Sequence, residues 1–287
     1  MITIIGAGRL ANYLAVALRA AGFRITEVIA RDSPRSRRRA RTLALKVGAQ
    51  AVTADSAALD ATLLWFCVPD REIRGVASAL TDRLLARAAM GRGAKVRFAL
   101  HSSGALSSRE LDPLRRAGIA VASAHPLMTF VAGALPSLTG VPFAVEGDAS
   151  ATRVARGMVR ALGGECFSLP ASRKAAYHAW ATLTSPLLLA FLVTLEEAAR
   201  AAGLTRPEAR RKSLPIIRQT LENYSRLGPA RSFSGPLVRG DAETVAKHLG
   251  VLKKHLGARE VYVALARAAL RGLPVKNREK LKRLLGS

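Results

Sequence analysis

Short apolar runs alternate with longer amphipathic stretches over residues 1–169 of the chain. Uninterrupted apolar runs are typical of strands buried on both sides, so we expect a parallel sheet covered by helices on both faces. The predicted strands are 2–5, 25–30, 51–53, 63–68, 96–100, 119–122, 143–146 and 166–169. The helices predicted between them include 11–21, 35–47 and 151–162.

The pattern changes after residue 169, where no further strand is expected and long stretches rich in Ala, Leu and Arg follow. We therefore predict an α/β domain at 1–169, with a mostly parallel doubly wound sheet, and an all-α C-terminal domain at 170–287. A helix is expected from Ser172 to about Ala202, with a kink at Pro186 because proline cannot donate the backbone hydrogen bond. Its predicted core face consists of Leu183, Leu187, Ala190, Phe191 and Thr194.

The segment Gly6-Ala7-Gly8-Arg9-Leu10-Ala11 directly follows the first predicted strand and precedes a helical pattern. In such a unit the first glycine permits a tight turn, and the second lets a pyrophosphate approach the backbone at the helix N-terminus. The third small residue allows the helix to pack closely on the strand. We therefore expect a dinucleotide-binding Rossmann domain, with cofactor contacts from Gly6, Ala7, Gly8, Arg9 and Leu10.

The residues after the second predicted strand bear on the choice of nicotinamide cofactor. Arg31 and Ser33 suit a ribose 2′-phosphate, because one is a planar cation and the other a hydroxyl donor. Asp32 lies between them and would favour NAD if the register were shifted by one residue. We predict NADP, with NAD as the alternative.

Polar residues follow the next predicted strands, whose carboxyl ends line the cofactor crevice in this fold. Val68, Pro69 and Asp70 are expected near the nicotinamide ribose, although helix capping would also explain Asp70. His101 and Ser102 are expected at the nicotinamide end, where Ser102 would orient the substrate or the carboxamide.

Three further residues are candidates for proton transfer. His125 follows a predicted strand and precedes a proline, which suits an acid or base, and a structural histidine is the competing interpretation. Lys174 and His178 are four residues apart and so share one face of a helix. Their neighbours Ala175, Ala176, Tyr177, Ala179 and Trp180 suggest a largely buried helix, in which a lysine requires a functional reason. We predict Lys174, His178, His125 and Ser102 as catalytic residues, and no metal site.

The net charge of +25 raises the question of a nucleic-acid partner, but arginine is spread over nearly all segments and only 5% of residues are aromatic. A solvated basic surface is the favoured interpretation, so nucleic-acid binding is not expected. The two cysteines lie far apart, which indicates buried thiols in a reducing compartment. Because apolar runs are short and the first strand leaves no room for a leader, we expect a cytoplasmic protein without a membrane span.

Several stretches together resemble a known family, over nearly the full chain. They are LHSSG (100–104), AHPLMTF (124–130), VPFAVEGD (141–148), KAAYH (174–178) and SGPLVRGD (234–241). They resemble Rossmann-like oxidoreductases whose C-terminal half is the domain of unknown function 2520. That family is similar in architecture to 6-phosphogluconate and 3-hydroxyisobutyrate dehydrogenases, pyrroline-5-carboxylate reductase and prephenate dehydrogenase.

The resemblance implies an NADP-binding domain, a helical domain for substrate binding and dimerisation, and an active site in the cleft between them. Lys174 is similar to the catalytic lysine of the hydroxyisobutyrate group, in which an asparagine stands where this chain has His178. His125 is similar to the catalytic histidine of prephenate dehydrogenases. We expect a homodimeric NADP-dependent oxidoreductase for a small carbonyl, hydroxyl or imine substrate. A non-catalytic NADP(H)-binding sensor is the alternative.

Overall fold

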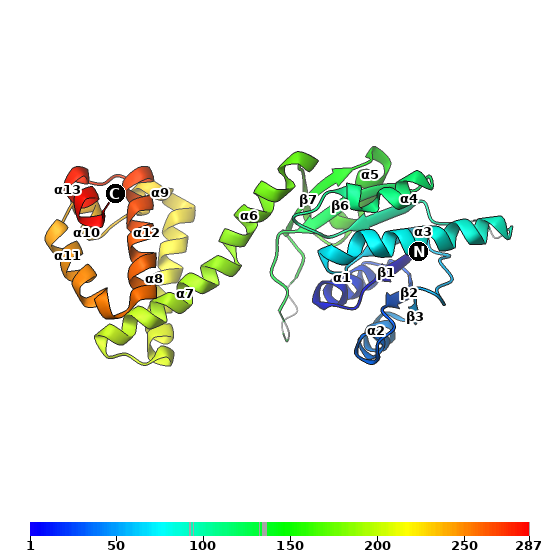
Figure 1. Ribbon diagram of the computed structural model, residues 1–287, viewed down its shortest axis with the longest axis horizontal. Helices are drawn as coiled ribbons and strands as arrows, with labels where there is room; N and C mark the ends of the chain where they lie inside the picture. Colours follow the sequence, from blue (N-terminus) through cyan, green and yellow to red (C-terminus); the bar gives the residue numbers. More distant parts are fainter. Residues whose placement is uncertain (92, 94, 132, 134–136, 287) are drawn as a thin grey trace. The chain divides into compact units, whose positions relative to one another are not determined.

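The computed structural model describes residues 1–91, 93, 95–131, 133 and 137–286 (Figure 1). The chain divides into two compact units, Met1–Thr182 and Leu183–Ser287. Helix α6 (Lys174–Thr184) belongs almost entirely to the first unit, because Lys174 and Tyr177 are buried against residues of strand β6.

The first unit contains one sheet with the strand order β3-β2-β1-β4-β5-β6-β7-β8. All neighbouring strands are parallel except β6 and β7, so the predicted mostly parallel, doubly wound sheet is confirmed. The strands are β1 (Ile2–Ile5), β2 (Ile25–Ala30), β3 (Gln50–Thr53), β4 (Leu63–Phe66), β5 (Phe98–His101), β6 (Ala120–Pro126), β7 (Pro142–Gly147) and β8 (Glu165–Ser168).

Strand β6 is longer than its apolar run predicted, and this changes the setting of His125. The expected end was residue 122, whereas the strand continues to Pro126 because His125 pairs with Ala144 of the antiparallel strand β7. His125 therefore lies within a strand and not after one.

Helices cover both faces of the sheet. One face packs against α1 (Arg9–Ala20), α2 (Pro34–Val47) and α5 (Ala149–Ala161). The other packs against α3 (Asp70–Ala89) and α4 (Asp112–Arg116), which follows a short 3₁₀ turn, Ser108–Leu111. Adjacent residues Ile4 and Ile5 of β1 enter opposite cores, because successive side chains of a strand point to opposite faces. Apolar burial on both sides explains the uninterrupted hydrophobic runs of the sequence.

The second unit consists of helices and their connections, with no strand among its described residues, as predicted. Its α-helices are α7 (Pro186–Ala199), α8 (Arg206–Leu227), α9 (Pro229–Ser232), α10 (Pro236–Arg239), α11 (Ala242–Val251), α12 (Leu256–Gly272) and α13 (Arg278–Leu285). The Asp241 side chain caps α11 by accepting a hydrogen bond from the Thr244 amide at 3.0 Å. A small core of Val245, Leu270 and Leu281 joins α11, α12 and α13.

The long helix predicted after Ser172 is interrupted at Ser185, directly before Pro186. The expected disruption at Pro186 is confirmed, since the proline begins a new helix, α7, in which its missing N–H is tolerated. The predicted core face is wrong for Leu183, Leu187 and Ala190, which are exposed. Phe191 and Thr194, the other two residues of the predicted face, do meet neighbours, since they line a hollow together with residues of α12.

Among the described residues, one helical run, Ala171–Ala202, is long and apolar enough to cross a membrane by length and composition. A single helix of this kind is weak evidence for a span, since core helices of other proteins satisfy the same criterion. The run begins beside Lys174, whose charged end is buried against β6.

Candidate functional site

The glycine turn after β1 borders a cavity of about 220 Å³. Gly6 has a φ of +103°, and a Cβ on it would lie 2.6 Å from the carbonyl oxygen of Cys67. Only glycine fits such a position without strain. Of the predicted cofactor residues, six line this cavity: Gly6, Ala7, Gly8, Arg31, Val68 and Pro69.

Helix α1 presents its N-terminus at this turn. Gly8 is its N-cap, no side chain caps the helix, and its first turn contains no acidic residue. The first backbone N–H groups and the positive end of the helix dipole are therefore available to an anion. Arg9 lines an adjoining hollow together with Arg39, whereas Leu10 packs against the hydrophobic core. Arg9 thus lies where it could contact a cofactor bound at the turn, whereas Leu10 packs into the core and does not line the cavity.

The far end of the cavity is basic. Arg31, Ser36 and Arg39 line it, and Arg31 forms an ion pair of 3.2 Å with Glu72. Ser33 instead caps α2 by accepting a hydrogen bond from the Ser36 amide at 3.4 Å. Two cationic groups and a hydroxyl suit a ribose phosphate.

Two features at this end escaped sequence reasoning. Asp32, the residue that argued for NAD, forms an ion pair with Arg37 on the exposed surface. Ser36 and Arg39 lie three residues apart, so they share the face of α2 that borders the cavity. This spacing could have indicated that both residues contact the cofactor. The neighbouring arginines of α2 follow no clear pattern, so the sequence does not show which of them face the cavity.

A second group of polar residues surrounds Lys174, which is only 2% exposed. Its Nζ donates hydrogen bonds to the carbonyl oxygen of Ser103 at 2.6 Å and to Oγ of Ser123 at 2.7 Å. Burial lowers the pKa of this amine to about 8, against the opposing influence of Glu146 and Asp70. The lysine is thus close to the boundary between its charged and neutral forms near neutral pH.

His125 lies beside Lys174 and is oriented by a phenol. Its Nδ1 is 2.8 Å from the hydroxyl oxygen of Tyr177. Burial, followed by the charge of Lys174, lowers the pKa of His125 to about 3, so the ring is neutral at physiological pH. The ring centroid of His178 is 6.2 Å from that of His125.

Gly104 lies at the point where these two imidazoles meet. A Cβ on Gly104 would lie 2.5 Å from Cδ2 of His178 and 2.9 Å from Nε2 of His125. A side chain here would displace the rings, so glycine is what allows both imidazoles to pack directly against the backbone. Sequence reasoning noted this glycine as part of a motif but assigned it no role.

The helix that carries Lys174 and His178 is not largely buried, contrary to the prediction. Lys174 and Tyr177 are buried, whereas His178, Ala175, Ala176, Ala179 and Trp180 are exposed. The physical reason is that only one narrow face of α6 meets the sheet, and the three-residue spacing of Lys174 and Tyr177 defines that face. Lys174 is therefore the more exceptional residue of the predicted pair.

The remaining predicted site residues are held by internal hydrogen bonds. Ser102 accepts a hydrogen bond from the indole Nε1–H of Trp65 at 2.9 Å. Oγ of Ser103 donates to Asp70 at 2.7 Å, so Asp70 supports this segment. His101 is fully buried and bonded to Ser103 and Ser107, and these bonds occupy both of its ring nitrogens. His101 and Asp70 thus support the segment after β5, where direct cofactor contacts were expected.

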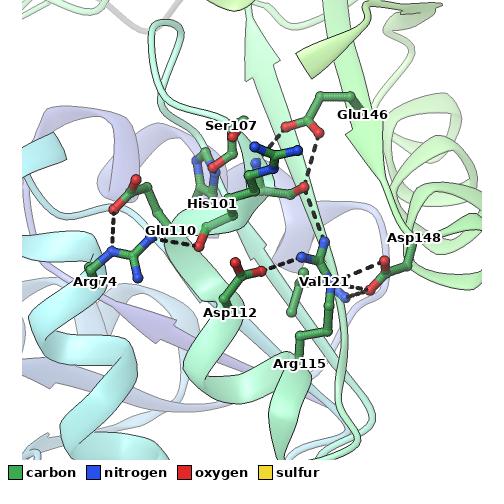
Figure 2. Close-up of polar contacts among 11 residues, drawn as sticks. Arg74, His101, Ser107, Glu110, Asp112, Arg115, Val121, Glu146 and Asp148 are labelled. Carbon is green, nitrogen blue, oxygen red and sulfur yellow. Dashed lines mark hydrogen bonds and ion pairs between the residues drawn. The ribbon is translucent and has the colours of Figure 1, made fainter. Parts of the chain in front are cut away.

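The turn that follows this segment is fixed by a polar network (Figure 2). Glu146 accepts hydrogen bonds from the amide and hydroxyl of Ser108, at 2.6 and 2.9 Å. Arg115 bridges Asp112 and Asp148, and Asp148 also accepts from the Val121 amide at 2.8 Å. Among the described residues, no group of three or more His, Cys, Asp or Glu side chains could hold a metal ion.

Comparison with protein families decides the classification. Residues 1–126 match the Rossmann-like domain model, and residues 141–269 match the model of the domain of unknown function DUF2520. The chain joins a Rossmann-like domain to a DUF2520 domain. The residues around Lys174 come from both, since Ser103, Ser123 and His125 lie in the Rossmann-like match and Lys174 and Tyr177 in the DUF2520 match.

Solved structures share the fold of this Rossmann-like and DUF2520 chain. One is a Bacteroides fragilis protein with a provisional assignment as an NADP oxidoreductase, which is 21% identical with a TM-score of 0.74. Another, from Thermotoga maritima, is 24% identical with a TM-score of 0.70. Each of these two alignments covers 93% of this chain and 96% of the matched chain. An imine reductase from Myxococcus stipitatus in complex with NADP⁺ is 15% identical, with a TM-score of 0.68 and 99% of both chains covered. Among curated protein sequences none matches this chain. These structural similarities establish the fold of the chain.

Proposed function

We propose that this protein is an NADP(H)-dependent oxidoreductase that acts on a small carbonyl, hydroxyl or imine compound. The observation that carries the proposal is a buried amine, Lys174, at the same sheet edge as a dinucleotide turn. Strand register aligns Ile5 with Phe66, Phe66 with His101, and His101 with Ser123, the hydroxyl partner of Lys174. The glycine turn follows Ile5, so the turn after β1 and the lysine beside β5 and β6 lie toward the carboxyl ends of the parallel strands, where this fold binds its ligands.

The residues of the first cavity fit NADP. Gly6 and Gly8 leave the backbone open for a pyrophosphate at the N-terminus of α1, while Arg31, Ser36 and Arg39 suit the 2′-phosphate. Structures with the same fold are solved with NADP or NADP⁺ bound, which supports the same cofactor here. When bound, the nicotinamide supplies or takes the hydride, so the protein must orient the substrate and handle one proton.

Lys174 is the proposed proton donor and acceptor. An ammonium has three N–H groups, and two of them are donated to Ser103 and Ser123. Among the described residues no acceptor is seen for the third, so this proton is available to a developing alkoxide or amine. With a pKa of about 8, the amine can release and recover this proton near neutral pH.

The two histidines have different roles in this proposal. His125 stays neutral, because burial lowers its pKa to about 3, and its ring is held by Tyr177. It therefore acts as a hydrogen-bonding group that orients the substrate and not as the acid. His178 lies against Gly104 and is exposed, so it would contact the substrate from the solvent side of the site.

A panel of small carbonyl and imine compounds, assayed through the loss of NADPH absorbance, tests the proposal. Lys174→Met should lower kcat at least about 100-fold, the range expected for removal of a general acid, with NADPH affinity unchanged. Lys95→Met, which changes an exposed lysine of the same unit, is the matched control. NADPH binding without turnover of any compound by the wild type would favour a non-catalytic sensor. Turnover that survives Lys174→Met would remove the catalytic assignment.

We also propose that the protein forms a homodimer through its C-terminal helices. Leu183, Leu187, Leu189 and Val193 are apolar residues of α6 and α7 that remain exposed in the single chain. An apolar surface of this kind on neighbouring turns is typical of an interaction site. Light scattering of Leu187→Lys should show a loss of dimer if this surface joins two copies, and an unchanged mass would contradict the assignment.

A further inference from the structure

We propose that His101 is a positioning residue that sets the direction of the Ser103 carbonyl toward Lys174 by tying together the two ends of the loop 102–107. The inference rests on the proposed role of Lys174 and assigns His101 a task within that site. His101 itself is buried at the end of β5 and touches neither the first cavity nor solvent.

The imidazole of His101 binds both ends of the loop. Its Nδ1 accepts a hydrogen bond from the Ser103 amide at 3.1 Å. Since Nδ1 is the acceptor, Nε2 carries the proton and donates to the carbonyl oxygen of Ser107 at 3.0 Å. Burial lowers the pKa of His101 to about 4, which keeps this neutral tautomer in place across the physiological range. One ring thus fixes the beginning and the end of the same loop.

The middle of the loop is held separately, and its residues face the site. Oγ of Ser103 donates to Asp70 and accepts from the Leu106 amide at 2.9 Å. Gly104 lies against His125 and His178. Beyond the loop, Ser108 is bonded to Glu146, and Figure 2 shows this network next to the pair of His101 and Ser107. The segment is therefore a constrained loop whose carbonyl at Ser103 and whose Cα at Gly104 form part of the site.

The Ser103 carbonyl is the closer of the two acceptors of Lys174. If the peptide turned away, the buried ammonium would lose that hydrogen bond, and its third N–H would lose its fixed direction. The other groups whose charges act on Lys174 are Glu146 on β7 and Asp70 on α3. Asp70 is bonded to Ser103 within the loop, and Glu146 is bonded to Ser108 directly after it.

A buried histidine could serve stability alone, and two substitutions at position 101 separate that role from positioning. His101→Asn keeps an acceptor for the amide two residues ahead, as in an Asx turn, whereas His101→Leu removes it. Leu111→Ala removes a fully buried side chain of the adjacent 3₁₀ turn and is the control for loss of stability without a change at the acceptor. Thermal melting of all three variants identifies the fraction that is folded.

The deciding measurement is the pKa of Lys174. It is obtained from an NMR titration of the full chain labelled with ¹³C-lysine, without substrate. Its resonance is assigned with Lys174→Met. The proposal expects His101→Leu to lower this pKa by at least about 0.5 unit, because the buried ammonium loses an acceptor. It also expects His101→Asn to restore most of the wild-type value and Leu111→Ala to leave it unchanged. An unchanged or raised pKa in His101→Leu, or an equal shift in Leu111→Ala, would overturn the positioning role.

This readout does not depend on turnover. If the wild type reduces no compound, the proposed oxidoreductase fails while the pKa series still decides the role of His101. If the wild type is active, kcat should fall in the order wild type, His101→Asn, His101→Leu, with the affinity for NADPH unchanged.

Discussion

The Nζ atom of Lys174 lies 2.6 Å from the carbonyl oxygen of Ser103, and this one hydrogen bond joins the first turn of α6 to the loop after β5. The donor is buried and charged at neutral pH, so the bond belongs to the charge-assisted class that is stronger than ordinary hydrogen bonds. It places a titratable amine at the carboxyl end of a sheet whose first turn is built for a dinucleotide. The chemistry proposed for the protein depends on this bond.

The pH dependence of turnover should follow the lowered pKa of Lys174. Below about pH 8 the amine is protonated and can donate, whereas above it the amine is neutral and can accept. The rate of carbonyl or imine reduction should therefore fall as pH rises through about 8, and the rate of the reverse oxidation should rise over the same range. Steady-state pH profiles in both directions measure this limb. In the residual activity of Lys174→Met the limb should be absent, and its persistence would assign the titration to another group.

The cofactor preference should depend on the basic end of the first cavity. The double variant Arg31→Ala with Arg39→Ala removes both guanidinium groups that line it. Loss of two charge-assisted contacts to a phosphate should raise the Kd for NADPH at least about tenfold and change that for NADH by much less. Isothermal titration with both cofactors gives the ratio. Arg41→Ala, an exposed arginine of the same helix outside this cavity, is the control. Equal weakening of NADPH and NADH would contradict a 2′-phosphate site.

Gly6→Ala should damage both the turn and cofactor binding. The alanine would have to adopt the positive φ of Gly6, and its methyl group would lie 2.6 Å from the Cys67 carbonyl oxygen. We therefore expect a loss of about 1–3 kcal/mol in unfolding free energy. Gly22→Ala is a matched control, because Gly22 also has a positive φ but has no atom near its Cβ position. Urea unfolding and NADPH titration of the two variants separate strain from steric overlap. NADPH affinity at the wild-type level in folded Gly6→Ala would exclude a cofactor at this turn.

Acid should destabilise the first unit through its buried histidines. The pKa of His101 is lowered from 6.5 to about 4. Between these two values its imidazole is protonated in the unfolded chain but neutral in the folded chain. Stability is present above pH 6.5 and is lost as pH falls toward 4, by up to about 1.4 kcal/mol per pH unit for one group. His125 acts in the same direction, with its pKa lowered to about 3. Urea unfolding at several pH values in this range gives the unfolding free energy as a function of pH. This free energy should fall less steeply with decreasing pH in His101→Asn, which has no imidazole at this position. An equally steep fall would show that His101 is not responsible for the acid sensitivity.

Much of the fold was predictable because its signals are local. The apolar runs of β1 and β2 matched their observed bounds, and the glycine turn could be identified from a few consecutive residues. The end of β6 was missed, since its last residues are small or polar and the strand continues only because β7 pairs with it. The exposed apolar side of α7 was likewise beyond local reasoning, because a helical pattern shows which residues are apolar but not which neighbour covers them.

The site was only partly predictable. Lys174 stood out as a cation among apolar residues, but its acceptors, Ser103 and Ser123, are 71 and 51 residues away along the chain. Tyr177 and Gly104 acquire their roles from contacts with His125, which lies on another element in each case. His101 and Asp70, expected at the cofactor, instead support the loop after β5.

The order of residues along this chain is enough to specify the strands, the glycine turn and the presence of an unusual lysine, because periodicity and turn chemistry act over a few neighbouring positions. The protonation state and direction of that lysine come from folding. Burial lowers its pKa, and two acceptors from separate segments orient it, which requires the sheet to bring β5, β6 and α6 together. Desolvation and hydrogen-bond geometry depend on distances in space, and those distances exist only in the folded chain.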